Sequence, residues 1–164
     1  MKFSGLTLNL LLLALIGLGE VSCNGEKLEE LQKLNEIVNN FPQITQIRPS
    51  TMSRRKINSH EICDDLIKPC DSGEIYYKEI LKQIDLSIED YKKIDQALID
   101  AEVRSYLWHP RFSTYIKSGA FGDIFGLLID KSPGEDLPEK FDLNSRYTIY
   151  IGNSILPNVY YFSN

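Results

Sequence analysis

Residues 75–108 read IYYKEILKQIDLSIEDYKKIDQALIDAEVRSYLW and carry the clearest helical pattern in the chain. Apolar residues recur at three and four positions, and the break at Asp85-Leu86-Ser87 divides the stretch in two. Ser87 supplies an N-cap hydroxyl, and the acidic residues after it suit the positive end of a helix dipole. The second half keeps its apolar spacing as far as Trp108. The pattern therefore predicts a helical hairpin over 75–109, which His109-Pro110 ends.

The segments before this hairpin differ from each other. In 23–42, leucines from Leu28 onward recur at helical spacing with charged residues opposite, which predicts an N-terminal helix ended by Phe41-Pro42. Residues 43–74 show no sustained period and are expected to form a loop that contains a disulfide. The basic residues in this region are few, and we interpret them as solvated.

After residue 110 the pattern changes to that of strands. A continuous apolar run over 124–129 predicts a buried strand, 146–152 alternates cleanly, and 158–162 predicts a short last strand. These strands are expected to form an antiparallel sheet over 110–164. The predicted fold is α+β, with the N-terminal and central helices packed on a C-terminal antiparallel sheet of three to four strands.

The first 22 residues have the features of a secretory signal. Lys2 precedes a leucine-rich apolar run over 6–19, and small and polar residues follow it. The run is shorter than the roughly 20 residues that a membrane-spanning helix needs. We therefore expect 1–22 to be removed and 23–164 to form a single exported domain.

Ser22-Cys23 after this leucine-rich run resembles the signal segment of bacterial lipoproteins, although Glu20 stands where those proteins usually have leucine. The resemblance covers the signal segment alone. It implies that Cys23 becomes the mature N-terminus and carries a diacylglycerol that holds the protein at a membrane of the cell envelope. Cleavage by an ordinary signal peptidase before Glu20 or Asn24 is the alternative, and it gives a freely secreted protein.

The other two cysteines, Cys63 and Cys70, lie seven positions apart and are expected to form a disulfide in an oxidising compartment. A zinc site made by both cysteines with His60 and His109 is the competing interpretation. Its spacing matches no compact zinc module and requires reduced cysteines outside the cytoplasm. We expect neither a metal nor another cofactor.

The net charge of −5 disfavours a nucleic-acid partner, since such proteins usually carry a basic excess. The clearest functional feature is a group of strand tyrosines, Tyr147, Tyr150, Tyr160 and Tyr161. Tyrosine is enriched at binding hot spots. The sequence thus favours a non-catalytic envelope protein of the inhibitor or immunity type, with an envelope or extracellular protein as its unknown partner. The alternative is a small exported hydrolase that uses His60, Glu61, Asp64 and Asp65 for acid–base chemistry.

Overall fold

The structure is a computed structural model that describes residues 27–63, 70–120, 123–143 and 147–164. Within these residues a helix over 27–39 comes first and is called the N-terminal helix. The remaining elements are β1 (Gln46–Arg48), β2 (Lys56–Ile57), β3 (His60–Cys63), β4 (Ile75–Tyr76), α2 (Tyr77–Gln83), α3 (Ile88–Asp100), β5 (Ser105–Trp108), β6 (Phe112–Ala120), β7 (Asp123–Asp130), β8 (Lys140–Leu143), β9 (Tyr147–Leu156) and β10 (Val159–Ser163).

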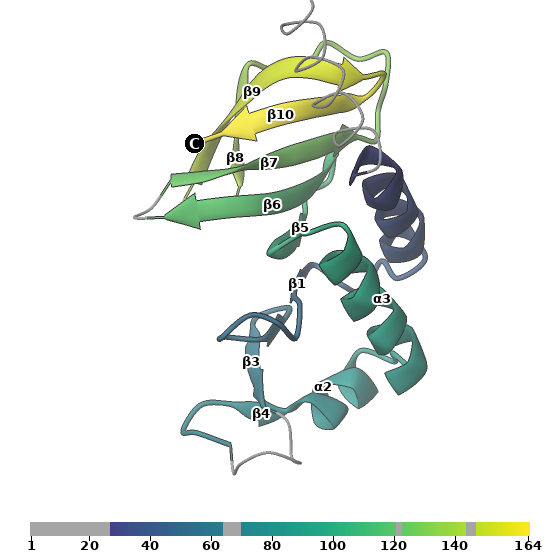
Figure 1. The fold of residues 1–164 in the computed structure, drawn as a ribbon, viewed down its shortest axis with the longest axis vertical. Coiled ribbons are helices and arrows are strands. Elements are labelled where there is room, and N and C mark those ends of the chain that lie inside the picture. The colour runs from purple at the N-terminus through teal and green to yellow at the C-terminus, as the bar shows by residue number, and fades with distance from the viewer. Residues whose placement is uncertain (1–26, 64–69, 121–122, 144–146) are drawn as a thin grey trace, which may run out of the picture.

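The strands form one ten-stranded sheet in the order β4-β3-β2-β1-β5-β6-β7-β10-β9-β8. The β3–β4 pair is parallel and the others are antiparallel. The predicted C-terminal sheet of three to four strands is therefore wrong. Half of the sheet comes from residues 46–108, where loops and helices were expected. Figure 1 shows the helices along one side of this long sheet.

The predicted hairpin over 75–109 is wrong at both ends, because Ile75–Tyr76 form β4 and α3 ends at Asp100. Glu102 adopts a left-handed backbone conformation, with φ of 54°. The Val103 N–H bonds back to the Leu98 carbonyl at 2.8 Å, so the chain leaves the helix there. The aromatic and aliphatic residues that follow pair with β6 as β5. Trp108 thus lies at the end of a strand, and the apolar spacing that placed it on a helix was coincidental.

Other sequence predictions are confirmed. The N-terminal helix buries Leu31, Leu34 and Val38 as its leucine spacing predicted. Strands β7, β9 and β10 lie within a few residues of the three strands expected after residue 110. The long alternating segment of β9 is predictable because it belongs to an extended strand whose period repeats several times.

The sheet packs an apolar layer on each face. The helix-side core joins Leu31 of the N-terminal helix and Leu98 of α3 to Tyr115 and Leu127 of β6 and β7. The Tyr115 hydroxyl also donates to Asn35 Oδ1 at 2.8 Å, which fastens the N-terminal helix to the sheet.

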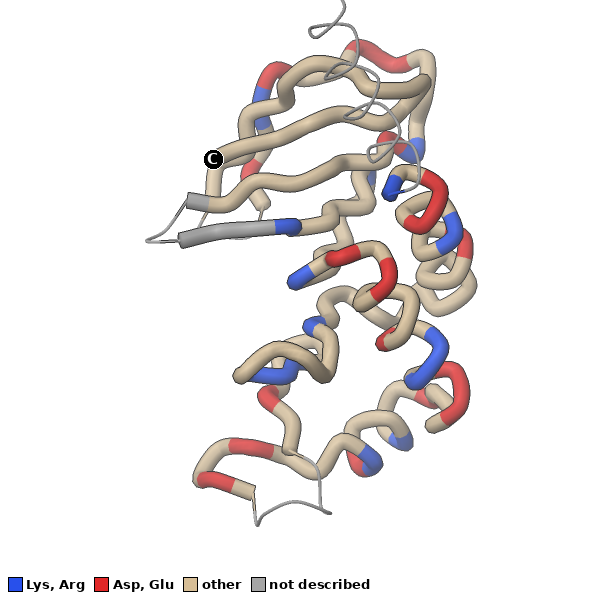
Figure 2. The backbone as a smooth tube through the Cα atoms, in the orientation of Figure 1, with Lys and Arg blue, Asp and Glu red and all other residues tan. Residues whose placement is uncertain are grey.

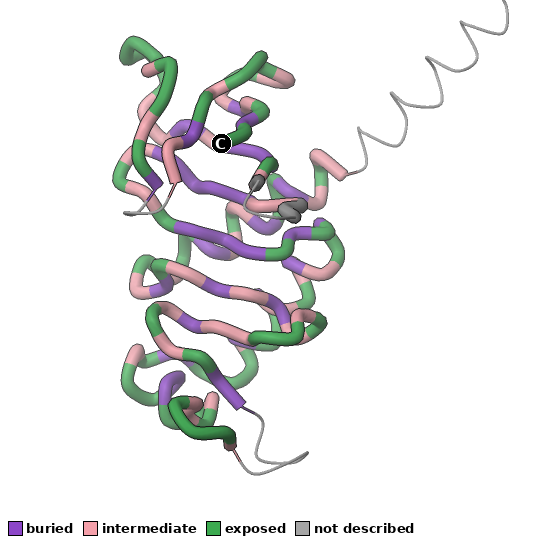
Figure 3. Tube along the Cα trace, turned by 90° about the vertical axis from the view of Figure 1, so that its left-hand side faces the viewer, coloured by how far each residue is buried: buried purple, intermediate pink, exposed green. Residues whose placement is uncertain are grey.

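The opposite face forms a second core beneath β8 and β9. Figure 3 looks onto this face, and buried segments run through the middle of the strands. The second core consists of Leu107, Phe112, Leu128, Leu143, Ile149 and Phe162. Phe141 of β8 stacks on Phe112 with ring centroids 4.7 Å apart, so the last strands of the sheet curl back over its centre. No helix is needed on this side.

The α3 cap gives a first testable prediction. Ser87 Oγ accepts a hydrogen bond from the Asp90 N–H at 3.0 Å, as the sequence predicted, and donates to Asp90 Oδ2 at 2.7 Å. Ser87→Ala is expected to lower the free energy of unfolding by about 1 kcal/mol, because an N–H of the first turn loses its partner. Urea unfolding measures this change. Ser87→Asn keeps a capping oxygen and should cost much less; equal losses in both variants would contradict the role of the cap.

The predicted disulfide is present. Cys63 ends β3, Cys70 precedes the turn into β4, and the Cα atoms of the two residues are 5.5 Å apart. Closing an eight-residue loop stabilises the folded state by about 2.5 kcal/mol on the chain-entropy estimate.

Reduction, or the double substitution Cys63→Ala/Cys70→Ala, should therefore lower the free energy of unfolding by about 2.5 kcal/mol. Denaturant unfolding with and without reductant checks this. Reductant should have no effect on the double variant, which controls for other actions of the reagent. An unchanged midpoint for the reduced wild-type protein would show that the bond contributes no stability.

Candidate functional site: an exposed aromatic surface

Three large aromatic side chains lie exposed on neighbouring strands of the sheet. Phe125 of β7, Tyr150 of β9 and Tyr161 of β10 are 54%, 52% and 50% exposed. These three residues are called the aromatic surface from here on. Large exposed aromatic groups on adjoining strands are uncommon on a protein that binds nothing, and such patches mark interaction sites.

The strand register places these three rings on one face. Ser163 of β10 pairs with Phe125 on one side and with Tyr150 on the other. Residues directly opposite in an antiparallel pair share a face, and so do residues two apart along a strand, which brings Tyr161 to the same side. Gly152 of β9 lies beside Tyr161, and a Cβ added there would be 3.6 Å from the Tyr161 Cβ. The surface thus depends on the sheet register.

A pocket of about 230 Å³ opens beside the aromatic surface. Its apolar floor is made by Leu28, Phe125, Leu127, Ile155 and Tyr161 with Gly126, and its charged rim by Lys27, Glu102 and Lys117. Leu28 and Lys27 come from the first turn of the N-terminal helix. The pocket therefore lies where this helix begins and where the sheet stops being covered by helices.

The charged groups of the rim are held in place. Lys27 Nζ and Glu102 Oε1 are 2.8 Å apart, and Lys117 Nζ donates to the Ala101 carbonyl at 2.6 Å. The hydrogen bond and attraction from Lys27 lower the pKa of the Glu102 carboxyl. Partial burial lowers the pKa of the Lys117 ammonium, against the attraction of Glu102. With two lysines and one glutamate, the rim carries a positive excess.

The structure divides the four tyrosines that the sequence singled out. Tyr150 and Tyr161 belong to the aromatic surface, whereas Tyr147 and Tyr160 are partly buried against the second core. Phe125 was missed because the continuous apolar run over 124–129 indicated burial on both faces. The helices end short of it, and no local sequence signal shows where they end.

The two residues of the hydrolase alternative that the structure describes, His60 and Glu61, do not form a site. His60 and Glu61 are consecutive on β3, so their side chains point to opposite faces. Glu61 is exposed. Both the pocket by the aromatic surface and a second pocket of about 360 Å³ over β1, β2 and β5 are lined by other residues. Asp64 and Asp65 lie outside the described residues, as do Cys23 and the signal segment.

Three residues of the zinc alternative, Cys63, Cys70 and His109, make other contacts. The disulfide joins Cys63 and Cys70, and the His109 ring packs beside the stacked rings of Phe112 and Phe141, with centroid distances of 5.5 and 4.7 Å. Burial and the neighbouring Lys131 lower the pKa of the His109 imidazole, so it is less readily charged than a free histidine. Among the described residues, no three His, Cys, Asp or Glu side chains gather in a way that would hold a metal ion.

In the part of the chain that the structure describes, no helix has the length and apolar character to span a bilayer. No protein-family model, curated protein or solved structure matches this chain.

Proposed function

We propose that this chain is an exported cell-envelope protein, anchored by a lipid on Cys23, whose folded domain acts by binding and not by catalysis. The observation that carries the proposal is the aromatic surface, whose three residues are each about half exposed beside an apolar pocket. Aromatic side chains in this setting supply most of the energy of many binding surfaces. The Cys63–Cys70 disulfide supports export, because such bonds persist in oxidising compartments.

The composition of the C-terminal strands also supports binding. Residues 147–164 contain no charged side chain. Figure 2 shows β9 and β10 without lysine, arginine or acidic residues, whereas the helices carry many. An uncharged surface loses little hydration energy when a partner covers it. The charges of the pocket rim then lie at the border of the contact, where they orient the bound partner.

The test compares the retention of the mature protein and of its Tyr150→Ala/Tyr161→Ala variant on washed cell-envelope preparations. Both proteins carry the same lipid, so a difference in retention comes from the aromatic surface. Removal of two exposed anchors is expected to weaken retention at least tenfold, since each is worth about 1 kcal/mol or more. Tyr76→Ala is the matched control, because Tyr76 is also an exposed tyrosine but lies on β4. If the paired variant stays folded and is retained as well as the control, the aromatic surface has no binding role.

A further inference from the structure

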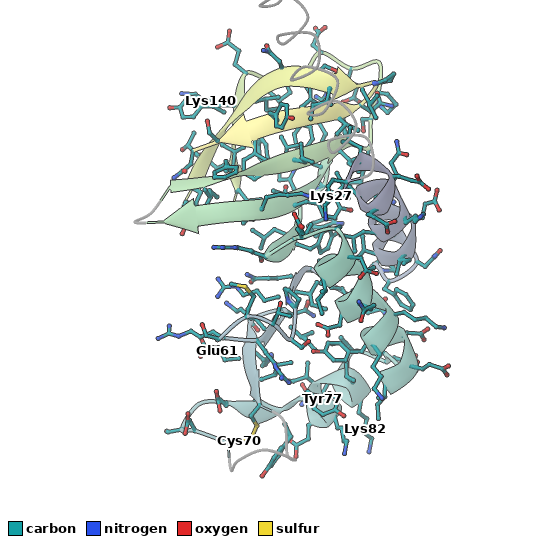
Figure 4. The ribbon with its side chains drawn as sticks, in the orientation of Figure 1. Lys27, Glu61, Cys70, Tyr77, Lys82 and Lys140 are labelled. Atoms are coloured by element: carbon teal, nitrogen blue, oxygen red, sulfur yellow. A yellow bond between two sulfur atoms is a disulfide. The ribbon has the colours of Figure 1, made fainter. Side chains whose placement is uncertain are left out.

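The position of the N-terminal helix fixes where the proposed lipid must lie. Lys27, its first described residue, lines the same pocket as Phe125 and Tyr161. Figure 4 shows Lys27 beside the strands of the C-terminal half, while Cys70 lies at the opposite end of the molecule. Cys23 precedes Lys27 by four residues, and a chain of that length spans at most about 14 Å. A lipid on Cys23 would therefore hold the aromatic surface within reach of the bilayer.

From this geometry we propose that the aromatic surface docks on the headgroup region of the membrane that holds the lipid. The inference rests on the proposed lipidation of Cys23 and names the partner of the same surface. Tyrosine rings are enriched at membrane–water interfaces, where the ring meets the acyl boundary and the hydroxyl meets the headgroups. Phe125 of β7 adds an apolar ring, which lines the pocket together with Tyr161.

The charge distribution is compatible with an anionic lipid surface. The rim lysines Lys27 and Lys117 outnumber Glu102, although the whole chain has a net charge of −5. A basic residue near an anionic membrane contributes about 1 kcal/mol. The strands that carry Tyr150 and Tyr161 have no acidic side chain that would be repelled.

Because the tether is short, weak contacts are sufficient to hold the aromatic surface on the membrane. A surface held next to its partner binds it as an intramolecular event, at an effective concentration set by the linker. Three rings that would give marginal membrane affinity in a free protein can thus fix the orientation of a tethered one. The segment between Cys23 and Lys27, at most about 14 Å long, leaves a protein partner of ordinary size little room between the pocket and the bilayer.

The other end of the sheet lies far from the aromatic surface. β4 is seven strand positions from β10 in the sheet order. At a spacing of about 4.8 Å this places β4 roughly 33 Å farther along the sheet. Tyr76 of β4, near the disulfide end, is thus remote from the aromatic surface, as the opposite ends of the sheet in Figure 1 indicate.

Tryptophan quenching in liposomes tests the inference on the full acylated mature chain. The chain has one tryptophan, Trp108, so Trp108→Phe gives a silent background. Tyr161→Trp in this background reports on the aromatic surface, and Tyr76→Trp reports on the far end of the sheet. Both variants are reconstituted in phosphatidylethanolamine–phosphatidylglycerol vesicles that contain a phospholipid with a nitroxide near its headgroup.

We expect the Tyr161→Trp signal to be quenched at least threefold more than the Tyr76→Trp signal. Phe125→Trp serves as a second reporter if Tyr161→Trp does not fold. Equal quenching of both reporters in a chain whose mass confirms acylation overturns membrane docking and leaves the lipid anchor intact, so a protein partner then becomes the occupant. A mature chain without the lipid overturns the anchor and the docking together.

Discussion

Gly126→Ala is expected to destabilise the protein by about 3 kcal/mol, with a fall in Tm of roughly 10 °C. Gly126 lies on β7 between β6 and β10, opposite Ile116 and Phe162. A Cβ at this position would overlap the carbonyl oxygen of Tyr115 and come within 2.9 Å of the Phe162 ring. The overlapping oxygen belongs to the backbone of β6, so β6 and β7 would have to move apart. Both cores depend on the pairing of these two strands.

Gly152→Ala is the matched control for this prediction. Gly152 also lies in a strand beside β10, but an added Cβ would be 3.4 Å from the nearest atom, the Tyr161 carbonyl oxygen, which is an ordinary contact. The control should change the free energy of unfolding by less than about 1 kcal/mol. Thermal and denaturant unfolding of the two variants measure the difference. Equal stabilities would mean that β6 and β7 are not packed as closely as described.

Removing the Arg111 guanidinium should have an effect of similar or larger size. Arg111 holds Asp130 through two parallel hydrogen bonds, Nε to Oδ1 at 3.2 Å and Nη2 to Oδ2 at 3.0 Å. The Asp130 side chain is 3% exposed. Arg111 also donates to the carbonyls of Glu135 and Asp136, so it joins β7 to the segment that leads to β8. Arg111→Met should cost about 3–5 kcal/mol at pH 7, because a buried carboxylate loses its partner.

The pH dependence separates this loss of charge pairing from a simple packing defect. Burial alone would raise the pKa of the Asp130 carboxyl, but the hydrogen bonds from Arg111 and the Ser132 N–H, with the attraction of Arg111, lower it overall. The wild-type carboxylate therefore stabilises the fold above the unfolded pKa of about 4, and this contribution is lost as the pH falls. Without Arg111, burial dominates and the same carboxyl is expected to have a raised pKa.

Urea unfolding of Arg111→Met between pH 7 and pH 4 should accordingly show a stability deficit that shrinks as the pH falls and Asp130 becomes protonated. The double variant Arg111→Met/Asp130→Asn, which has no buried charge, should recover part of the loss at pH 7. A deficit that stays constant with pH, or that Asp130→Asn fails to reduce, would mean that the pair contributes through packing alone.

The parts of the fold that could be predicted are those with several repeats of one period. α3 repeats its apolar spacing over three turns and begins at a side-chain cap, and the first half of β9 alternates from Tyr147 to Ile151. β2 and β4 have two residues each, too few to show any period. They pair with strands nearby in the chain, and this group joins the rest of the sheet only where β1 pairs with β5, for example Gln46 with Leu107, so no sustained local period could reveal half of the sheet.

The candidate site was partly predictable for a related reason. Tyr150 and Tyr161 fall on the outward side of alternating strands, which pattern alone indicates. Tyr147 lies three residues from Tyr150, and Tyr160 adjoins Tyr161, so alternation turns Tyr147 and Tyr160 to the other face, where they pack against the second core. The pocket of Leu28 with Phe125 requires the N-terminal helix to begin beside β7, about 100 positions away in the chain, and this is a property of the tertiary structure.

The intact mass of the native mature protein, with and without reductant, tests whether an envelope protein is tethered beside its binding surface. We expect a chain that begins at Cys23, carries the mass of a diacylglyceryl group and gains two hydrogens on reduction of the Cys63–Cys70 bond. An unmodified chain that begins at Glu20 or Asn24 would contradict the tether and make the protein a freely secreted one.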